Sequence, residues 1–208
     1  MRFRALRLTA LLLALLLIAA GCSSKPKEAE KKPFGLGSWE GTTFVNEWFD
    51  LKLTVPEKSQ ILTKEQIAQV NGAGQDVLVE DGVLDEKDLE KLEGTTFYDF
   101  YVFNEDSTVS MSLGYEKMPS GMTASAYLAS IKNQLKSLTS MQYEIGDTSK
   151  TELAGYTYHT LQASMYEGYV QQRYLVREQD GFAGFLILTY QNVKADEAEK
   201  LLENVTKP

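Results

Sequence analysis

The sequence contains little of what catalytic and metal sites are commonly built from. Among its 208 residues there are one cysteine, Cys22, and one histidine, His159. A disulfide needs two cysteines and a His-rich zinc site needs three histidines, so neither can form within this chain. Also missing are a Gly-x-Ser-x-Gly elbow, a glycine-rich phosphate loop and a dinucleotide fingerprint. We therefore predict that the protein is not an enzyme and has no cofactor or metal.

Arginine is scarce as well. Outside the first 21 residues only Arg173 and Arg177 occur, and the whole chain has a formal net charge of −8. Proteins that bind nucleic acid neutralise its phosphates with clustered lysine and arginine. An excess of carboxylates disfavours such a partner and mainly promotes solubility. We predict no nucleic-acid partner.

The one long apolar run, Leu8–Ala20, stands at the N-terminus. Three arginines precede it, and a series of small residues ending at Gly21 leads to Cys22. A positive head, a short apolar core and small residues are the layout of a secretory signal, and a bilayer-spanning helix needs about 20 apolar residues. Small residues ending on a cysteine resemble the lipobox of bacterial lipoproteins. We expect residues 1–21 to be cleaved and Cys22 to carry diacylglycerol and acyl chains such as palmitate. The alternative is an ordinary signal with an incidental cysteine.

The rest of the chain divides into a tether and one domain. Residues 22–37 are rich in Lys, Glu, Pro and Gly and cannot bury enough apolar surface to fold, so we predict a flexible tether. Residues 38–208 are long enough for a single domain, which we expect to be monomeric. The predicted location is extracytoplasmic, with the lipid in the cell membrane, or in an outer membrane if the source has one.

Alternating and apolar patterns predict an antiparallel sheet. Residues 42–55 read as two short strands, and the strands at 97–103 and 109–115 should pair. The first of that pair is apolar on both faces, which predicts the centre of the sheet, whereas the second alternates and should border water. Residues 143–191 read as a meander ending in a central strand at 182–190. The expected turns are Gly146-Asp147, Ala154-Gly155, Glu167-Gly168 and Asp180-Gly181.

Capping signals predict the helices. Thr63 with Gln66 forms a capping box, Asp85 is an N-cap, and Thr123 precedes a stripe of apolar residues at helical spacing, Leu128, Ile131, Leu135 and Leu138. Residues 195–205 give a last amphipathic helix. Residues 76–82 are ambiguous between loop and strand. Strands interrupted by helices without strict βαβ alternation predict an α+β fold, an antiparallel β-sheet with helices packed on its faces.

Two stretches carry a family resemblance. Residues 39–49 read Trp-Glu-Gly-Thr-Thr-Phe-Val-Asn-Glu-Trp-Phe and lead into Leu-Lys-Leu-Thr-Val-Pro, and residues 172–177 read Gln-Arg-Tyr-Leu-Val-Arg before an Asp-Gly turn and an apolar strand. The chain thereby resembles the small bacterial lipoproteins of the PsbP-like superfamily, although Asp50 replaces the small residue usual in its turn. The resemblance implies a PsbP-like α/β/α sandwich and a non-catalytic accessory, assembly or binding role. It carries over no catalytic residue.

Three groups of residues are candidates for a site. His159 shares a strand face with apolar residues, which favours a packed or strand-edge histidine. The acidic stretch Glu80–Asp88 lacks the spacing of a calcium loop and favours a solvated helix start. Arg173 and Arg177 are four apart on one strand, so they share a face and could clamp an anion; the alternative is cross-strand pairing with nearby carboxylates. With Tyr169 they form the candidate binding face.

The predicted role is that of a membrane-anchored accessory or binding module of the cell envelope. Eleven tyrosines exceed what a core needs, and exposed tyrosines suit a binding face. We place that face between the sheet and residues 62–94, lined by aromatics and by the two arginines, with an envelope protein, peptide or glycan as partner. The alternative is an extracytoplasmic enzyme of unrecognised type acting on an envelope substrate.

Overall fold

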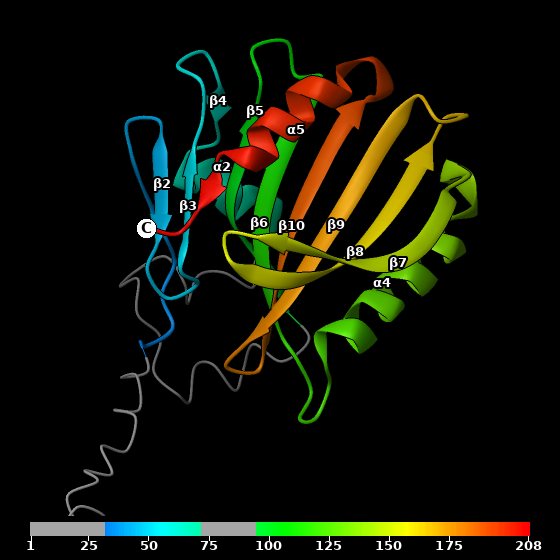
Figure 1. Cartoon of the computed structure of the whole chain (residues 1–208), viewed down its shortest axis with the longest axis horizontal. Helices are drawn as coiled ribbons and strands as arrows, with labels where there is room; N and C mark the ends of the chain where they lie inside the picture. Colours follow the sequence, from blue (N-terminus) through cyan, green and yellow to red (C-terminus); the bar gives the residue numbers. More distant parts are fainter. Residues whose placement is uncertain (1–31, 72–94) are drawn as a thin grey trace, which may run out of the picture. The chain divides into compact units, whose positions relative to one another are not determined.

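The computed structural model describes residues 32–71 and 95–208 (Figure 1). Residues 33–208 form one compact unit. The predictions for the signal peptide and Cys22, for the helix at Asp85, and for residues 76–82 and 80–88 lie outside the described residues.

The larger of two antiparallel sheets has seven strands within the described part of the chain. In spatial order they are β4 (Gln60–Ile61), β5 (Thr96–Phe103), β6 (Val109–Lys117), β10 (Phe182–Gln191), β9 (Val170–Gln179), β8 (Tyr156–Met165) and β7 (Glu144–Leu153). The meander from β7 to β10 is confirmed, and its turns at 154–155, 167–168 and 180–181 place residues at positive φ.

The sequence analysis predicts two strands of the smaller sheet but not that they belong to a separate sheet. It consists of β1 (Ser38–Glu40), β2 (Thr43–Asn46), β3 (Leu51–Thr54) and β11 (Val205–Thr206), in that order. Because β11 pairs with β3, the end of the chain returns to the strands that begin the fold. The predicted strand pair at 42–55 is confirmed as β2 and β3.

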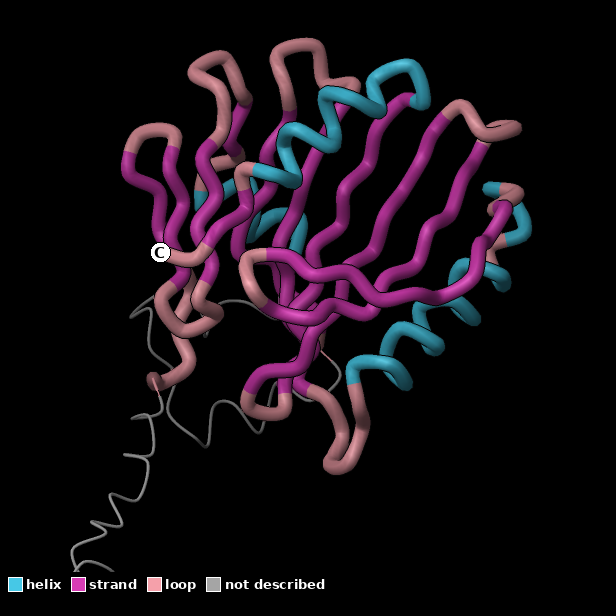
Figure 2. Tube along the Cα trace, in the orientation of Figure 1, coloured by secondary structure: helices cyan, strands magenta, loops and turns pink. Residues whose placement is uncertain are grey.

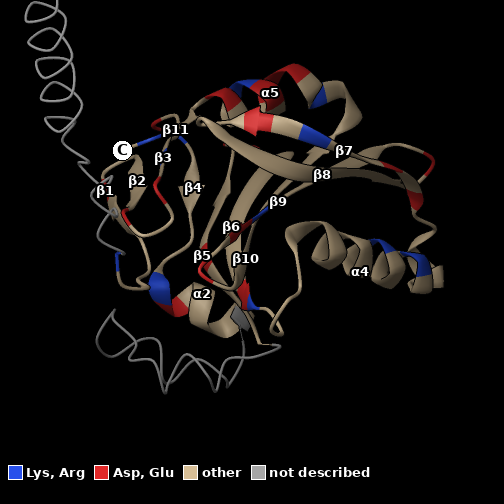
Figure 3. Cartoon of the chain, turned by 60° about the horizontal axis from the view of Figure 1, so that its bottom comes forward, with Lys and Arg blue, Asp and Glu red and all other residues tan. Residues whose placement is uncertain are grey.

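The helices lie on both faces of the larger sheet (Figures 2 and 3). Helix α5 (Ala195–Glu203) and the smaller sheet cover one face, and α2 (Lys64–Asn71) and α4 (Ala124–Ser137) lie on the other. Short 3₁₀ turns, η2 (Thr139–Met141) and η3 (Asn192–Lys194), follow α4 and precede α5. In Figure 3 both α5 and β7 carry charged residues of both signs. The predicted α+β sandwich is confirmed.

Two predicted helix starts are confirmed by their caps. Gln66 N–H donates to the Thr63 hydroxyl at 3.3 Å, and the Gln66 side chain accepts from Thr63 N–H at 2.8 Å. The Thr123 hydroxyl accepts from Ala126 N–H at 3.2 Å and begins α4. Each cap satisfies backbone donors that a helix leaves without intrahelical partners.

The prediction of which paired strand is central is wrong. β6 lies between β5 and β10, whereas β5 has only the two-residue β4 beyond it. The face of β6 that reads as polar carries small residues, and the ring of Phe185 on β10 covers Gly114: a Cβ on Gly114 would lie 2.6 Å from ring atoms of Phe185. Ser112 on β6 is buried as well. Small residues here mark close packing, which alternation alone cannot distinguish from exposure to water.

Three smaller predictions are also corrected. Gly146-Asp147 is no turn but a register shift inside β7, between Ile145 and Thr148. Leu138 lies outside α4, because the helix ends at Ser137, and it is 45% exposed instead of packed with the rest of the predicted stripe. Val205 pairs with Leu53 as part of β11 instead of extending α5.

The packed unit begins before the predicted boundary at residue 38. Phe34 is buried, with its ring 4.8 Å from that of Phe182 and 4.6 Å from that of Trp48. The tether prediction is therefore wrong for residues 33–37. Burial of one large aromatic side chain helps to order a segment whose average composition predicts disorder.

A buried carboxylate, Asp99 on β5, fixes this segment. Gly37 N–H donates to both of its oxygens at 3.0 Å, Asn46 Nδ2 donates at 2.8 Å, and the Tyr115 hydroxyl donates at 3.2 Å. Asn46 Nδ2 also lies 3.1 Å from Gly35 O. One side chain therefore connects the N-terminal segment, β2 and the larger sheet.

Burial raises the pKa of Asp99 from its ordinary 3.8 to about 6, and the hydrogen bonds from Asn46, Gly37 and Tyr115 oppose that rise. Between these two values the folded protein binds more protons than the unfolded chain, so its stability falls as pH rises. Relative to Asp99→Asn, whose amide does not titrate, the wild type should lose up to about 3 kcal/mol of unfolding free energy between pH 4 and pH 7.

Urea unfolding of both proteins across that range measures the difference. Other titrating groups are shared by the two chains and cancel in the comparison. Parallel pH profiles for wild type and Asp99→Asn would contradict the assignment.

Candidate functional site

Arg177 on β9 is buried, with 5% of its surface exposed. Its guanidinium carbon lies 3.6 Å from the ring centre of Phe49 and 4.2 Å from that of Tyr156. Nε donates to the Tyr158 hydroxyl at 3.0 Å, Nη1 donates to Gln179 Oε1 at 2.6 Å, and Nη2 donates to the Phe49 carbonyl. All three nitrogens are thus used inside the protein.

These contacts hold the turn between β2 and β3. The Asn46 side chain accepts from Phe49 N–H at 2.7 Å, the Gln179 amide donates to the Trp48 carbonyl, and Trp48 Nε1 donates to Asp180 at 3.2 Å. The Tyr156 hydroxyl donates to Asp50, which adopts a positive φ of 47°. Arg177 therefore has a structural role, because it joins the turn between β2 and β3 of the smaller sheet to β9.

Arg173 has a different partner. It donates two hydrogen bonds to Glu199 on α5, from Nη1 to Oε2 at 3.1 Å and from Nη2 to Oε1. Its side chain also borders a small polar cavity of about 170 Å³ with Thr160 and Gln162 of β8. Pairing with a carboxylate, the alternative considered for the arginines, is thus observed for Arg173, although the partner is on a helix and not on a neighbouring strand.

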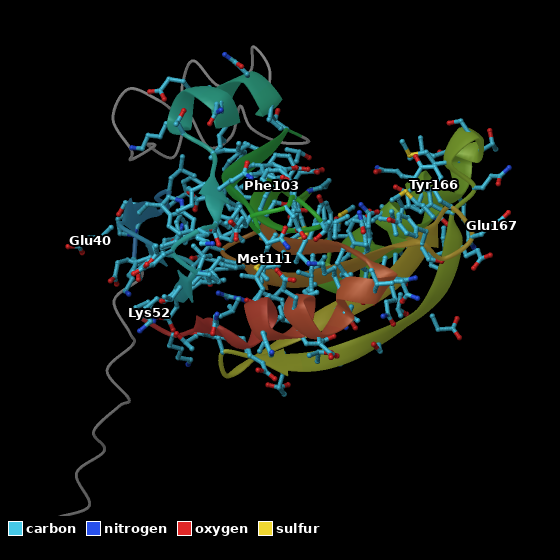
Figure 4. All side chains as sticks on the ribbon, turned by 90° about the horizontal axis from the view of Figure 1, so that it is seen from above. Glu40, Lys52, Phe103, Met111, Tyr166 and Glu167 are labelled. Atoms are coloured by element: carbon cyan, nitrogen blue, oxygen red, sulfur yellow. The ribbon has the colours of Figure 1, made fainter. Side chains whose placement is uncertain are left out.

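Tyr169 lies at the turn between β8 and β9 and is 53% exposed. Its carbonyl accepts from Asn192 N–H at 2.8 Å, and Tyr166 in the same turn is 60% exposed. Figure 4 places Tyr166 and Glu167 at one end of the unit, away from Glu40 and Lys52. The three residues of the predicted binding face therefore lie in three different surroundings: Arg177 is in the core, Arg173 contacts α5, and Tyr169 is in an exposed turn.

The arginines also lie on the opposite face of the sheet from a groove that borders α4. Along β9, Leu175 packs in the core beneath α5 and the smaller sheet, and Tyr174 and Val176 pack beneath α4. Arg173 and Arg177 share the face of Leu175 because side chains alternate along a strand. Arg173 and Arg177 therefore do not line that groove. Residues 72–94, which the prediction places opposite the sheet, lie outside the described residues.

The groove lies between α4 and the face of β5, β6, β9 and β10. It has a volume of about 590 Å³, within the range of ligand sites. Four rings contribute to its lining, from Tyr98, Tyr127, Tyr174 and Phe185. The Tyr98 and Phe185 rings meet edge to face at 5.8 Å, and the Tyr127 and Phe185 rings are nearly parallel at 6.3 Å.

One carboxylate, Glu116 on β6, belongs to this groove. Its Oε2 accepts from the Thr96 hydroxyl at 2.7 Å and from the Tyr127 hydroxyl at 2.8 Å. Burial raises the pKa of Tyr127 above its ordinary range, so this hydroxyl remains a neutral donor to the carboxylate. Burial also raises the pKa of Tyr174. The groove therefore presents aromatic rings, neutral hydroxyls and one oriented carboxylate.

Sequence reasoning missed Glu116 and the assignment of tyrosines to this groove. The surplus of tyrosines was the available signal, but it does not say which of them share a cavity.

His159 is half-buried within β8, which has strands on both sides, so it is a packed and not an edge histidine. Among the described residues no group of three or more His, Cys, Asp or Glu is arranged to hold a metal ion.

Comparison with known proteins shows the fold. No family model matches the chain, and no curated protein matches its sequence. The solution structure of cyanobacterial PsbP (CyanoP) from Synechocystis sp. PCC 6803 is similar with a TM-score of 0.50 and 11% identity, over 86% of this chain and 96% of that one. LpqN, involved in cell envelope biogenesis of Mycobacterium tuberculosis, matches with a TM-score of 0.42 and 15% identity, over 76% and 83%. The similarity to CyanoP shows that the fold is PsbP-like. The TM-score of LpqN is too low to support a further conclusion.

The two arginines should respond differently to the same change. Arg177→Lys loses the planar stack between Phe49 and Tyr156 and two of three directed hydrogen bonds, and we expect it to lower the unfolding free energy by about 2–4 kcal/mol. Arg173→Lys keeps a cation beside Glu199 at the surface and should cost less than about 1 kcal/mol. Urea denaturation of the pair measures both, and equal losses would contradict the structural role assigned to Arg177.

Proposed function

We propose that the chain is an extracytoplasmic lipoprotein, anchored through lipid on Cys22, and that its PsbP-like domain is a non-catalytic binding module of the cell envelope. The observation that carries the proposal is the groove beside α4, with its volume of about 590 Å³ and its aromatic lining. Ligand sites are concave and mostly apolar, with a few placed polar groups. The groove has these properties.

The buried charged residues bind other groups of the protein, which supports a binding function over a catalytic one. Catalysis of acid–base or nucleophilic type needs convergent titratable groups within reach of a substrate. Asp99 has a strongly shifted pKa, yet its oxygens are taken by Gly37, Asn46 and Tyr115. Arg177 is likewise enclosed by its partners. Both groups therefore serve the fold.

Attachment at the N-terminus agrees with where the packed unit begins. The residues between Cys22 and Phe34 can reach about 40 Å when fully extended, which is enough to hold a domain clear of lipid headgroups. No helix among the described residues has the length and apolar character needed to cross a bilayer. The lipid is then the anchor on which the proposal depends. A PsbP-like fold is consistent with the accessory role that the family resemblance implies.

Replacing Cys22 tests the anchor. In Cys22→Ala we expect incorporation of labelled fatty acid to vanish and the protein to leave the membrane fraction, because two or more acyl chains anchor stably and no helix among the described residues can replace them as an anchor. The matched control is Ser23→Ala, next to the cysteine, which should label and fractionate like the wild type. The wild type should also resist washing with high salt. Membrane retention of Cys22→Ala would refute the lipid anchor.

A further inference from the structure

The groove beside α4 is long. Its lining runs along α4 from Tyr127 and ends at Leu138, directly after the helix, a distance of about 16 Å at the rise of an α-helix. An extended polypeptide advances about 3.3 Å per residue, so roughly five residues match this length. Exposed polar side chains of α4, Ser130 and Gln134, border the groove and can meet backbone groups of such a segment.

Its charge has one sign. Glu116 is the only charged residue among the described residues that line the groove, and no lysine or arginine is among them. Both hydroxyl donors, from Thr96 and Tyr127, bind Oε2, so Oε1 accepts from no other described residue. Two donors on one oxygen hold the carboxylate in place and leave its second oxygen for a ligand.

The aromatic rings also favour a positively charged ligand. The face of an aromatic ring is negative, and a cation within about 6 Å of a ring centre is attracted to it. Tyr98, Tyr127 and Phe185 bring three such rings together beside the carboxylate. The chain as a whole has a net charge of −8, which favours the approach of a positively charged partner.

We propose that this groove binds an extended segment of a partner polypeptide in which a lysine or arginine is flanked by apolar residues, with the basic side chain directed to Glu116. The apolar neighbours occupy the space beside Ile131 and Phe185, and the cation pairs with Oε1 across the rings. The inference rests on the proposed binding function and names its ligand class.

Length and charge distinguish this occupant from others. A small amine would satisfy Glu116 but fill a fraction of the groove. An anionic ligand would meet an unpaired carboxylate and no cation among the described lining residues. A neutral glycan would leave the charge of Glu116 without a partner, and desolvating an unpaired carboxylate is unfavourable. A basic segment between apolar residues fits the length of the groove, the charge of Glu116 and the aromatic lining.

The test uses the mature chain, residues 22–208, in nanodiscs of zwitterionic lipid, and the peptide acetyl-Leu-Phe-Lys-Phe-Leu-amide. Calorimetric titration compares it with the same peptide carrying Nε-acetyllysine and with benzylammonium. We expect the lysine peptide to bind at least about tenfold more tightly than either, as expected for one charge-assisted contact. Equal affinity for the acetylated peptide would overturn the assignment of a cation site, and equal affinity for benzylammonium would overturn the assignment of a peptide.

Glu116→Gln supplies the second arm, because the amide oxygen can still accept from Thr96 and Tyr127. This variant should lose the preference for the lysine peptide while binding the acetylated peptide within about twofold of the wild type. Glu203→Gln on α5, exposed and on the other face of the sheet, makes the same change in net charge and should leave the preference intact. Loss of preference in both variants, or no binding of any peptide, would overturn the inference. A failed Cys22→Ala experiment would instead concern the anchor alone.

Discussion

Two buried charges, Asp99 and Arg177, hold the N-terminal part of the domain against the larger sheet. Asp99 binds Gly37 and Asn46, and Arg177 stacks on Phe49 and binds its carbonyl. Burial raises the pKa of Tyr115 well above its ordinary range; the charge of Asp99 raises it further, and the charge of Arg177 opposes the rise. Removing one member of such a network leaves a buried charge without its partners. The loss of unfolding free energy is then larger than the net stabilisation that the intact network provides. The interaction therefore specifies where residues 35–50 lie more than it adds stability.

This arrangement gives the two faces of the sheet different roles. The face that carries Arg173 and Arg177 is covered by α5 and the smaller sheet, and its charged groups are paired within the protein. On the opposite face α4 packs against β7, β8 and β9 and leaves a groove beside it over β5, β6 and β10. A single strand, β9, contributes Arg173 and Arg177 to one face and the ring of Tyr174 to the other. The structural network and the candidate binding site are thus separated by the sheet itself.

Local signals in the sequence predicted most elements, because caps, turns and alternation are set by residues close together in the chain. The capping residues Thr63 and Thr123 and the turns at Gly155, Gly168 and Gly181 are of this kind. Strand order was mispredicted because Gly114 reads as an open position until Phe185, far along the chain, is seen to cover it. The ordering of Phe34 and the groove around Glu116 likewise depend on contacts between distant segments. No periodicity reports such contacts.

Native-state hydrogen exchange of the Gly37 and Phe49 amides tests most directly whether the buried side-chain network makes residues 35–50 part of the cooperative fold. Both N–H groups donate to side chains, Asp99 and Asn46, outside any strand pairing. If the network is cooperative with the core, these amides should exchange only through global unfolding and be as protected as amides of β6 and β10. Exchange orders of magnitude faster than in those strands would show local opening and contradict the account.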